Sequence, residues 1–129
     1  MSRFQHVNPP TVPVPFSRYS QGVIVESPAR WFYISGQVGI PLGGVLPDSF
    51  EEQARNAWRN VFGLLEAAGM SPANLIKVTA YLTRSSDVGQ YRTVRDSMLG
   101  EVSTASTLVV VAGLADPRLL IEIEAIAAD

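Results

Sequence analysis

The sequence has no cysteine and only one histidine, His6, among its 129 residues. Without thiols, the chain can form neither disulfides nor cysteine-based zinc sites, and it cannot use a thiolate as a nucleophile. The lone histidine lies in a proline-rich segment, so a Ser-His-Asp triad or a dedicated transition-metal site is not expected. A chain of this length can bury a core without such cross-links, and we expect a single domain over residues 1–129.

An excess of charge of one sign and a long hydrophobic run are also missing. The formal net charge is −2, with both signs scattered, and this predicts no basic surface for nucleic acid. The longest strongly apolar stretch, residues 108–115, is too short to span a bilayer, and the first residues lack the pattern of a secretory signal. We therefore expect a soluble cytoplasmic protein with neither a nucleic-acid nor a membrane partner.

Hydrophobic periodicity predicts the order of the elements. Prolines at positions 9, 10, 13 and 15 predict an extended arm over residues 1–16. Strands are predicted near residues 20–26, 31–35, 75–83, 107–112 and 119–127, and helices over residues 50–68 and 87–99. The first two strands are expected to pair as an antiparallel hairpin. The order β-β-α-β-α-β-β predicts an α+β fold, a mixed sheet with two helices packed on one face, and the uncovered face then needs a subunit partner.

Both predicted helices have recognisable ends. Ser49 and Glu52 form a capping-box pattern before the first helix, and Gly69 and Gly100 are placed to end the two helices. One stripe of the second helix should face the core, and it consists of Val88, Tyr91, Val94, Arg95 and Met98. Arg95 is the charged residue in this set.

The last predicted strand has two different faces. Ile121, Ile123, Ala125 and Ala127 alternate with a second set that carries two carboxylates, Glu122 and Glu124, between Leu120 and Ile126. Residues two apart share a face of a strand, so the first set should pack on the core. The second set is either a partly buried surface, against a subunit or a ligand, or an ordinary solvated face, and the pattern favours neither.

A set of short motifs, taken in order along nearly the whole chain, resembles the Rid (YjgF) family of reactive-intermediate imine/enamine deaminases. The motifs are Tyr19-Ser20-Gln21-Gly22, Ser35-Gly36-Gln37, Gln53-Ala54-Arg55, Asn60-Val61, Glu66-Ala67-Ala68-Gly69 and the stretch from Ile121 to Ala127. The resemblance implies a chorismate-mutase-like fold and a homotrimer with a cleft between each pair of subunits. It also implies hydrolysis of an imine or enamine to a keto acid and ammonia, with no metal and no cofactor.

The resemblance assigns roles to individual residues. Tyr19 matches the tyrosine that closes the cleft, and Ser35 and Gly36 match the pair that lines its floor. Glu122 matches the glutamate that positions the attacking water. Glu122 and Tyr19 are therefore the predicted catalytic residues.

The sequence departs from the family at the arginine that grips the substrate carboxylate. That position is occupied by Ser106, followed by Thr107, and a serine cannot hold a carboxylate by charge. Substrate recognition is therefore expected to be altered, with poor activity on carboxylate-bearing imines. Arg18 and Arg92 are candidates for a replacement cation, although a solvated surface role is the commoner one for each.

Three functions are compatible with the sequence. The first is an imine/enamine hydrolase with altered recognition, in which Ser106, Thr107, Ser35, Gly36, Arg18 and Arg92 contribute to substrate binding. The second is a non-catalytic trimer that binds a small metabolite in the same cleft. The third is an activity on nucleic acid, which the acidic balance of the chain disfavours.

Overall fold

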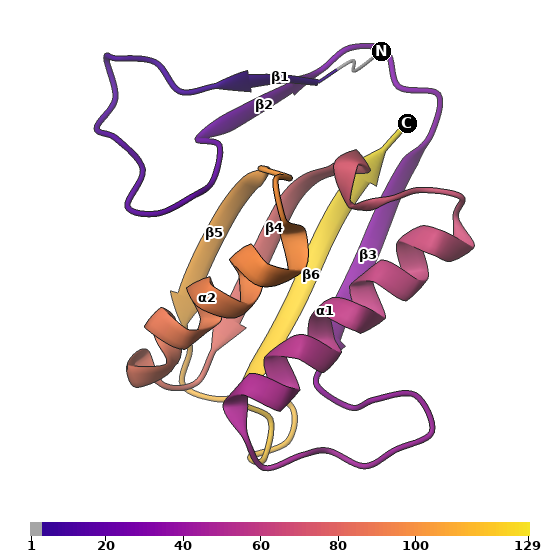
Figure 1. Cartoon of the computed structure of the whole chain (residues 1–129), viewed down its shortest axis with the longest axis vertical. Coiled ribbons are helices and arrows are strands. Elements are labelled where there is room, and N and C mark those ends of the chain that lie inside the picture. The colour runs from indigo at the N-terminus through magenta and orange to yellow at the C-terminus, as the bar shows by residue number, and fades with distance from the viewer. Residues whose placement is uncertain (1–3) are drawn as a thin grey trace.

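A four-stranded sheet with the order β3-β6-β4-β5 forms the centre of the computed structural model, which describes residues 4–129. Strand β6 is antiparallel to β3 and β4, whereas β4 and β5 are parallel. Both α-helices cover the same face of this sheet (Figure 1). The elements are β1 (Phe4–Val7), β2 (Gly22–Val25), β3 (Trp31–Val38), α1 (Phe50–Ala67), η1 (Pro72–Asn74), β4 (Leu75–Leu82), η2 (Ser85–Asp87), α2 (Val88–Leu99), β5 (Ala105–Val110) and β6 (Ile121–Ala128). The predicted α+β class, with two helices on one face of a mixed sheet, is confirmed.

The predicted hairpin between the first two strands is wrong. Strand β2 pairs with β1, a strand inside the predicted arm, and β3 pairs with β6. The chain turns at Ser27, whose φ is 42°. The residues that follow are bonded to the C-terminal residue: the Ala29 N–H donates to the Asp129 carbonyl, and the Asp129 N–H donates to the Arg30 carbonyl. This pairing extends the β3–β6 ladder, and β2 pairs instead with the segment before Pro9. The residues of that segment, unlike proline, have a backbone N–H that can form a ladder bond. Residues 1–3 of the arm lie outside the described residues.

The alternation predicted for the last strand is confirmed. Ile121, Ile123 and Ala127 are fully buried and Ala125 nearly so, in one cluster with the apolar stripe of α1. The partly exposed residues of β6 and β4 lie on the opposite face, which we call the uncovered face; they are Glu122, Glu124 and Ile126 together with Lys77, Thr79 and Tyr81. The same two strands therefore build the core with one side and present polar groups with the other.

Helix α1 begins and ends as its sequence predicts, and its polar edge fixes the neighbouring loops. The Ser49 side chain accepts a hydrogen bond from the Glu52 N–H at 3.1 Å, and Gly69 has a φ of 72°. The buried Gln53 side chain donates to the carbonyls of Pro47 and Arg118 and accepts from the Leu120 N–H. This side chain thereby joins the loop before α1 to the loop before β6, and it satisfies its own buried amide.

Candidate functional site

Glu122 lies on the uncovered face, in a strand that has a neighbour on both sides. Its carboxylate packs directly against Gly36 of β3, so that a methyl group at Gly36 would lie only 2.9 Å from the Glu122 Cγ and closer still to the carboxylate. The β3–β6 register shifts between Ile34 and Gln37, which places Gly36 in an irregular stretch of the ladder. Glycine is needed here because any side chain would displace the glutamate. The structure thus brings Glu122, Gly36 and the adjacent Ser35 together.

A cavity of about 340 Å³ continues this face. It is lined by Ser35, Thr79, Lys77 and Glu124 together with the apolar groups of Tyr33, Ile34, Ala125 and Ile126. Glu124 of this lining accepts a short hydrogen bond from the Tyr81 hydroxyl, and this bond, with a smaller effect of desolvation, raises the pKa of Tyr81 above its ordinary value. The Lys77 Nζ donates to the Thr107 Oγ1 at 2.6 Å, so its charge is directed toward β5.

A second cavity, of about 250 Å³, lies at the edge strand β5 beside α2; we call it the edge cavity. Ser106 and Leu108 point to the helix-covered side, because they are paired with the inward-facing Val78 and Ala80 of β4. The lining residues are Phe16, Ser17, Tyr19, Arg92, Arg95, Ser106, Thr107 and Leu108. The predicted catalytic residue Tyr19 and three residues predicted to bind substrate, Arg92, Ser106 and Thr107, are therefore together in this cavity.

Arg95 was not among the predicted site residues, and the structure places it in the wall of the edge cavity. Only 4% of its surface is exposed. Its Nε donates to the Asp96 Oδ1 at 3.0 Å, and its Nη1 reaches the Ser17 Oγ at 3.4 Å. Its buried Nη2 lies 3.0 Å from the Asp96 Oδ1 but forms no hydrogen bond with it. Its position on the buried stripe of a helix could have indicated it, because a charged side chain is rarely buried unless it is paired.

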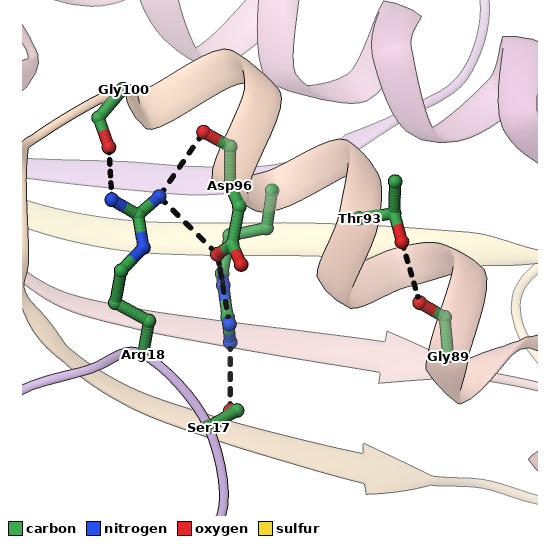
Figure 2. Close-up of polar contacts among 7 residues, drawn as sticks. Ser17, Arg18, Gly89, Thr93, Asp96 and Gly100 are labelled. Carbon is green, nitrogen blue, oxygen red and sulfur yellow. Dashed lines mark hydrogen bonds and ion pairs between the residues drawn. The ribbon is translucent and has the colours of Figure 1, made fainter.

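Arg18 is not in the lining of either cavity. Its guanidinium donates to the main-chain carbonyls of Gly100 and Asp96 and forms an ion pair with the Asp96 carboxylate at 3.4 Å, as Figure 2 shows. A cation at this position neutralises the unpaired carbonyls at the C-terminal end of α2. The structure therefore gives Arg18 a contact that ties the segment after the arm to α2, and a role in binding substrate stays a prediction.

The two groups of predicted residues are on opposite sides of the sheet. Ser106 faces the helix-covered side of β5, whereas Glu122 faces the uncovered side of β6, and β4 lies between these strands. With neighbouring strands about 4.8 Å apart, the two strand axes are separated by about 10 Å. One chain therefore cannot place Glu122 and Ser106 against the same small molecule.

Metal-binding clusters and membrane-spanning helices are both absent from residues 4–129. No group of three or more His, Asp or Glu side chains in this part of the chain is arranged to hold a metal ion. None of the helices within the same range is long and apolar enough to cross a bilayer.

The fold defines the class of protein: a small α+β domain with two cavities of about 340 and 250 Å³. The chain belongs to the Rid (YjgF) family, because the family model described as "Endoribonuclease L-PSP" matches residues 10–129. The predicted family membership is thereby confirmed.

Individual relatives agree with this membership. The chain is 34% identical to a RutC family protein of Aquifex aeolicus, over 93% of this chain and 94% of that one. It is 36% identical to the 2-iminobutanoate/2-iminopropanoate deaminase of Mus musculus, over 89% and 84% of the two chains. Among solved structures, a Rid protein of Yersinia pestis superposes with a TM-score of 0.84 at 25% identity, covering 98% of each chain. RidA of an Antarctic Psychrobacter superposes with a TM-score of 0.72 at 32% identity, covering 97% and 99%.

Proposed function

We propose that this protein hydrolyses small imines to a carbonyl compound and ammonia. The observation that carries the proposal is the packing of the Glu122 carboxylate against Gly36 on an uncovered sheet face, where a water and a small substrate have access. The relatives named 2-iminobutanoate/2-iminopropanoate deaminase support the same reaction class.

The reaction needs a held water and a route for its protons. The water oxygen attacks the imine carbon, the C=N π electrons pass to nitrogen, and the nitrogen takes up a proton. The resulting aminoalcohol then releases ammonia as its hydroxyl becomes a carbonyl. Glu122 is suited to accept a proton from the water and return it to the nitrogen. Tyr19 is suited to donate a hydrogen bond to the substrate.

The complete site requires a second copy of the chain. Glu122 and the edge cavity are on opposite sides of the sheet, and the uncovered face also presents apolar groups, among them Tyr33, which is 70% exposed. We propose a homotrimer in which the uncovered face of one subunit meets the edge cavity of the next. Light scattering of the purified protein at micromolar concentration tests this; a monodisperse monomer contradicts it.

Ammonia release from imines generated in the assay by a dehydratase or an amino-acid oxidase tests the reaction. Wild type should accelerate release, and Glu122→Gln should lower the rate by about 10²–10⁴-fold, the usual contribution of a positioned acid–base group. Glu66→Gln, an exposed glutamate on α1, is the matched control and should keep the wild-type rate. Retention of the rate in Glu122→Gln would remove the carboxylate from the mechanism.

A second candidate is a trimer that binds a small metabolite without turnover. Ser106 favours it, because the position at which the family's deaminases carry an arginine has no charge here. No ammonia release from acidic and neutral imines, together with tight binding of a small molecule, would establish this candidate. The family description names an endoribonuclease, but the net charge of −2 gives no support to binding of nucleic acid.

A further inference from the structure

We propose that the edge cavity binds the carboxylate of the substrate, and that Arg92 and Arg95 of α2 supply the positive charge that is missing at Ser106. The inference rests on the proposed function for the reaction that follows, but the binding of a carboxylate stands independently of turnover. The 2-imino acids for which the deaminase relatives are named would then remain substrates, and the new element is that α2 supplies the positive charge.

The charges around the edge cavity favour an anion. Arg92 and Arg95 are in its lining, and no acidic side chain is among the described residues that line it. Asp96, the acid paired with Arg95, is also paired with Arg18. Two arginines thus share one aspartate, and Arg92 adds a further positive charge to the lining of the cavity.

Arg95 is a buried cation whose donors are incompletely used. Within residues 4–129 its Nη2 has no hydrogen-bond partner, and its Nη1 contact with the Ser17 Oγ, at 3.4 Å, is at the limit of hydrogen-bond length. A buried guanidinium in a partly apolar wall is costly unless its charge is compensated and its donors are satisfied. Asp96 compensates part of this charge, and a carboxylate in the cavity would satisfy the remaining donors, with a small displacement of Ser17 opening the guanidinium to it.

Arg92 provides the accessible contact. It precedes Arg95 by three residues, so the two side chains share one face of α2. Its side chain is half-buried, and within residues 4–129 it forms no hydrogen bond or ion pair. Its guanidinium is therefore available to grip a carboxylate by two parallel hydrogen bonds.

Ser106 completes the cavity from the opposite wall. An arginine at this position would occupy much of a space of about 250 Å³, whereas serine leaves that space open and adds a neutral donor. The Tyr19 hydroxyl is a second neutral donor in the same lining. The loss of charge on β5 and the gain of charge on α2 are thus complementary. Ser106 alone predicts poor recognition of acidic imines, whereas the arginines of the cavity predict that acidic imines are bound.

The test compares an acid with its uncharged counterpart by calorimetric titration. The probes are 2-oxobutanoate and 2-oxobutanamide, and the protein is the full chain in its native assembly. Wild type should bind the acid at least about tenfold more tightly than the amide, because charge-assisted hydrogen bonds are about twice as strong as neutral ones. Arg92→Gln and Arg95→Gln should each lower the affinity for the acid by about 10–100-fold and change that for the amide by less than about threefold.

Two controls keep the result interpretable. Arg59→Gln, an exposed arginine on α1, should leave both affinities unchanged. Because Arg95 is buried, its variant is first checked by thermal unfolding, and if it does not fold, Arg92→Gln alone carries the decision.

The outcomes separate this inference from the proposed function. Equal affinity for acid and amide, or an unchanged preference in Arg92→Gln, overturns the carboxylate site even if imines are hydrolysed. Arginine-dependent binding of the acid without ammonia release from any imine upholds the site and overturns the hydrolase.

Discussion

The helix-covered and uncovered faces of the sheet share the same strands but differ in what completes them. On β6 the inward residues are closed off by the chain's own helices, whereas the outward residues Glu122, Glu124 and Ile126 remain partly exposed. The inward face needs only this chain to be buried. The outward face gathers a catalytic candidate and a cavity that the chain alone does not cover. Stability should therefore depend mainly on the helix-covered face, and assembly and the acid–base step of Glu122 on the uncovered face.

The largest expected effect comes from truncating the same side chain on each face. Ile123→Ala removes a fully buried side chain from between the sheet and α1 and should lower the free energy of unfolding by about 2–5 kcal/mol. Ile126→Ala, on the uncovered face, should cost much less within one chain and act mainly on assembly. Urea unfolding at two protein concentrations separates these effects, since only assembly depends on concentration. Equal, concentration-independent losses would mean that the two faces do not differ in this way.

Two glycines give the next contrast. Gly36→Ala should push the Glu122 carboxylate aside and lower the rate of ammonia release by about 10–100-fold, which corresponds to about 1.4–2.7 kcal/mol. Stability should change little, because the displaced atoms belong to the end of a flexible side chain. Gly63→Ala, in the exposed middle of α1 with open space around its Cα, should keep the rate and raise the free energy of unfolding by about 0.5–1 kcal/mol. A fully active Gly36→Ala would show that the contact with Glu122 has no part in the reaction.

A smaller effect is expected at Ser106. If the carboxylate were unpartnered in the wild type, Ser106→Arg would raise activity on an acidic imine by about 10–100-fold. With Arg92 and Arg95 already in the cavity, a third guanidinium adds repulsion and fills space, so we expect no increase. Steady-state rates on the imine formed from serine by a dehydratase distinguish the two. A clear gain would mean that α2 does not supply the charge.

The smallest effect concerns two tyrosines, one on each side of the sheet. The bond from Tyr81 to Glu124 raises the Tyr81 pKa above its ordinary value of about 10, so its contribution to stability is present below pH 10 and is lost as pH rises through the folded pKa. Tyr81→Phe should therefore be slightly less stable at pH 7 and indistinguishable from wild type in strong alkali. Tyr91→Phe should be neutral or stabilising at pH 7, because the buried Tyr91 hydroxyl has no partner within the described part of the chain. Unfolding curves at pH 7 and above pH 10 check both.

Periodicity predicted most of the elements because each face of a strand or helix is encoded locally. The alternation in β6 and the caps of α1 depend on residues a few positions apart, and both are confirmed. Strand pairing is not local: nothing between residues 20 and 35 shows that β3 joins the C-terminal strand and β2 joins the arm. The hairpin prediction was wrong for that reason.

Candidate site residues could be named from the sequence, but their arrangement could not be predicted from it. One cavity does contain four of the predicted residues, Tyr19, Arg92, Ser106 and Thr107. Arg95 also lines it, but its place on the apolar stripe of a helix indicated only that it is buried. Nothing in the sequence distinguishes Arg18 from Arg92 as a candidate cation. They differ in the structure because Arg18 contacts the C-terminal end of α2, whereas Arg92 lines the edge cavity. Such distinctions depend on which elements pack together, and a single sequence does not contain that information in any local pattern.

The placement of Ser106 and Glu122 on opposite sides of the sheet has a genetic consequence. If one cleft takes its carboxylate from one chain and its arginines from the next, two inactive alleles can rescue each other. Co-expression of Glu122→Gln with Arg92→Gln would mix the chains, and about a quarter of the clefts in random trimers would receive an intact group from each parent. An enzyme whose site lay within one chain would show no such complementation.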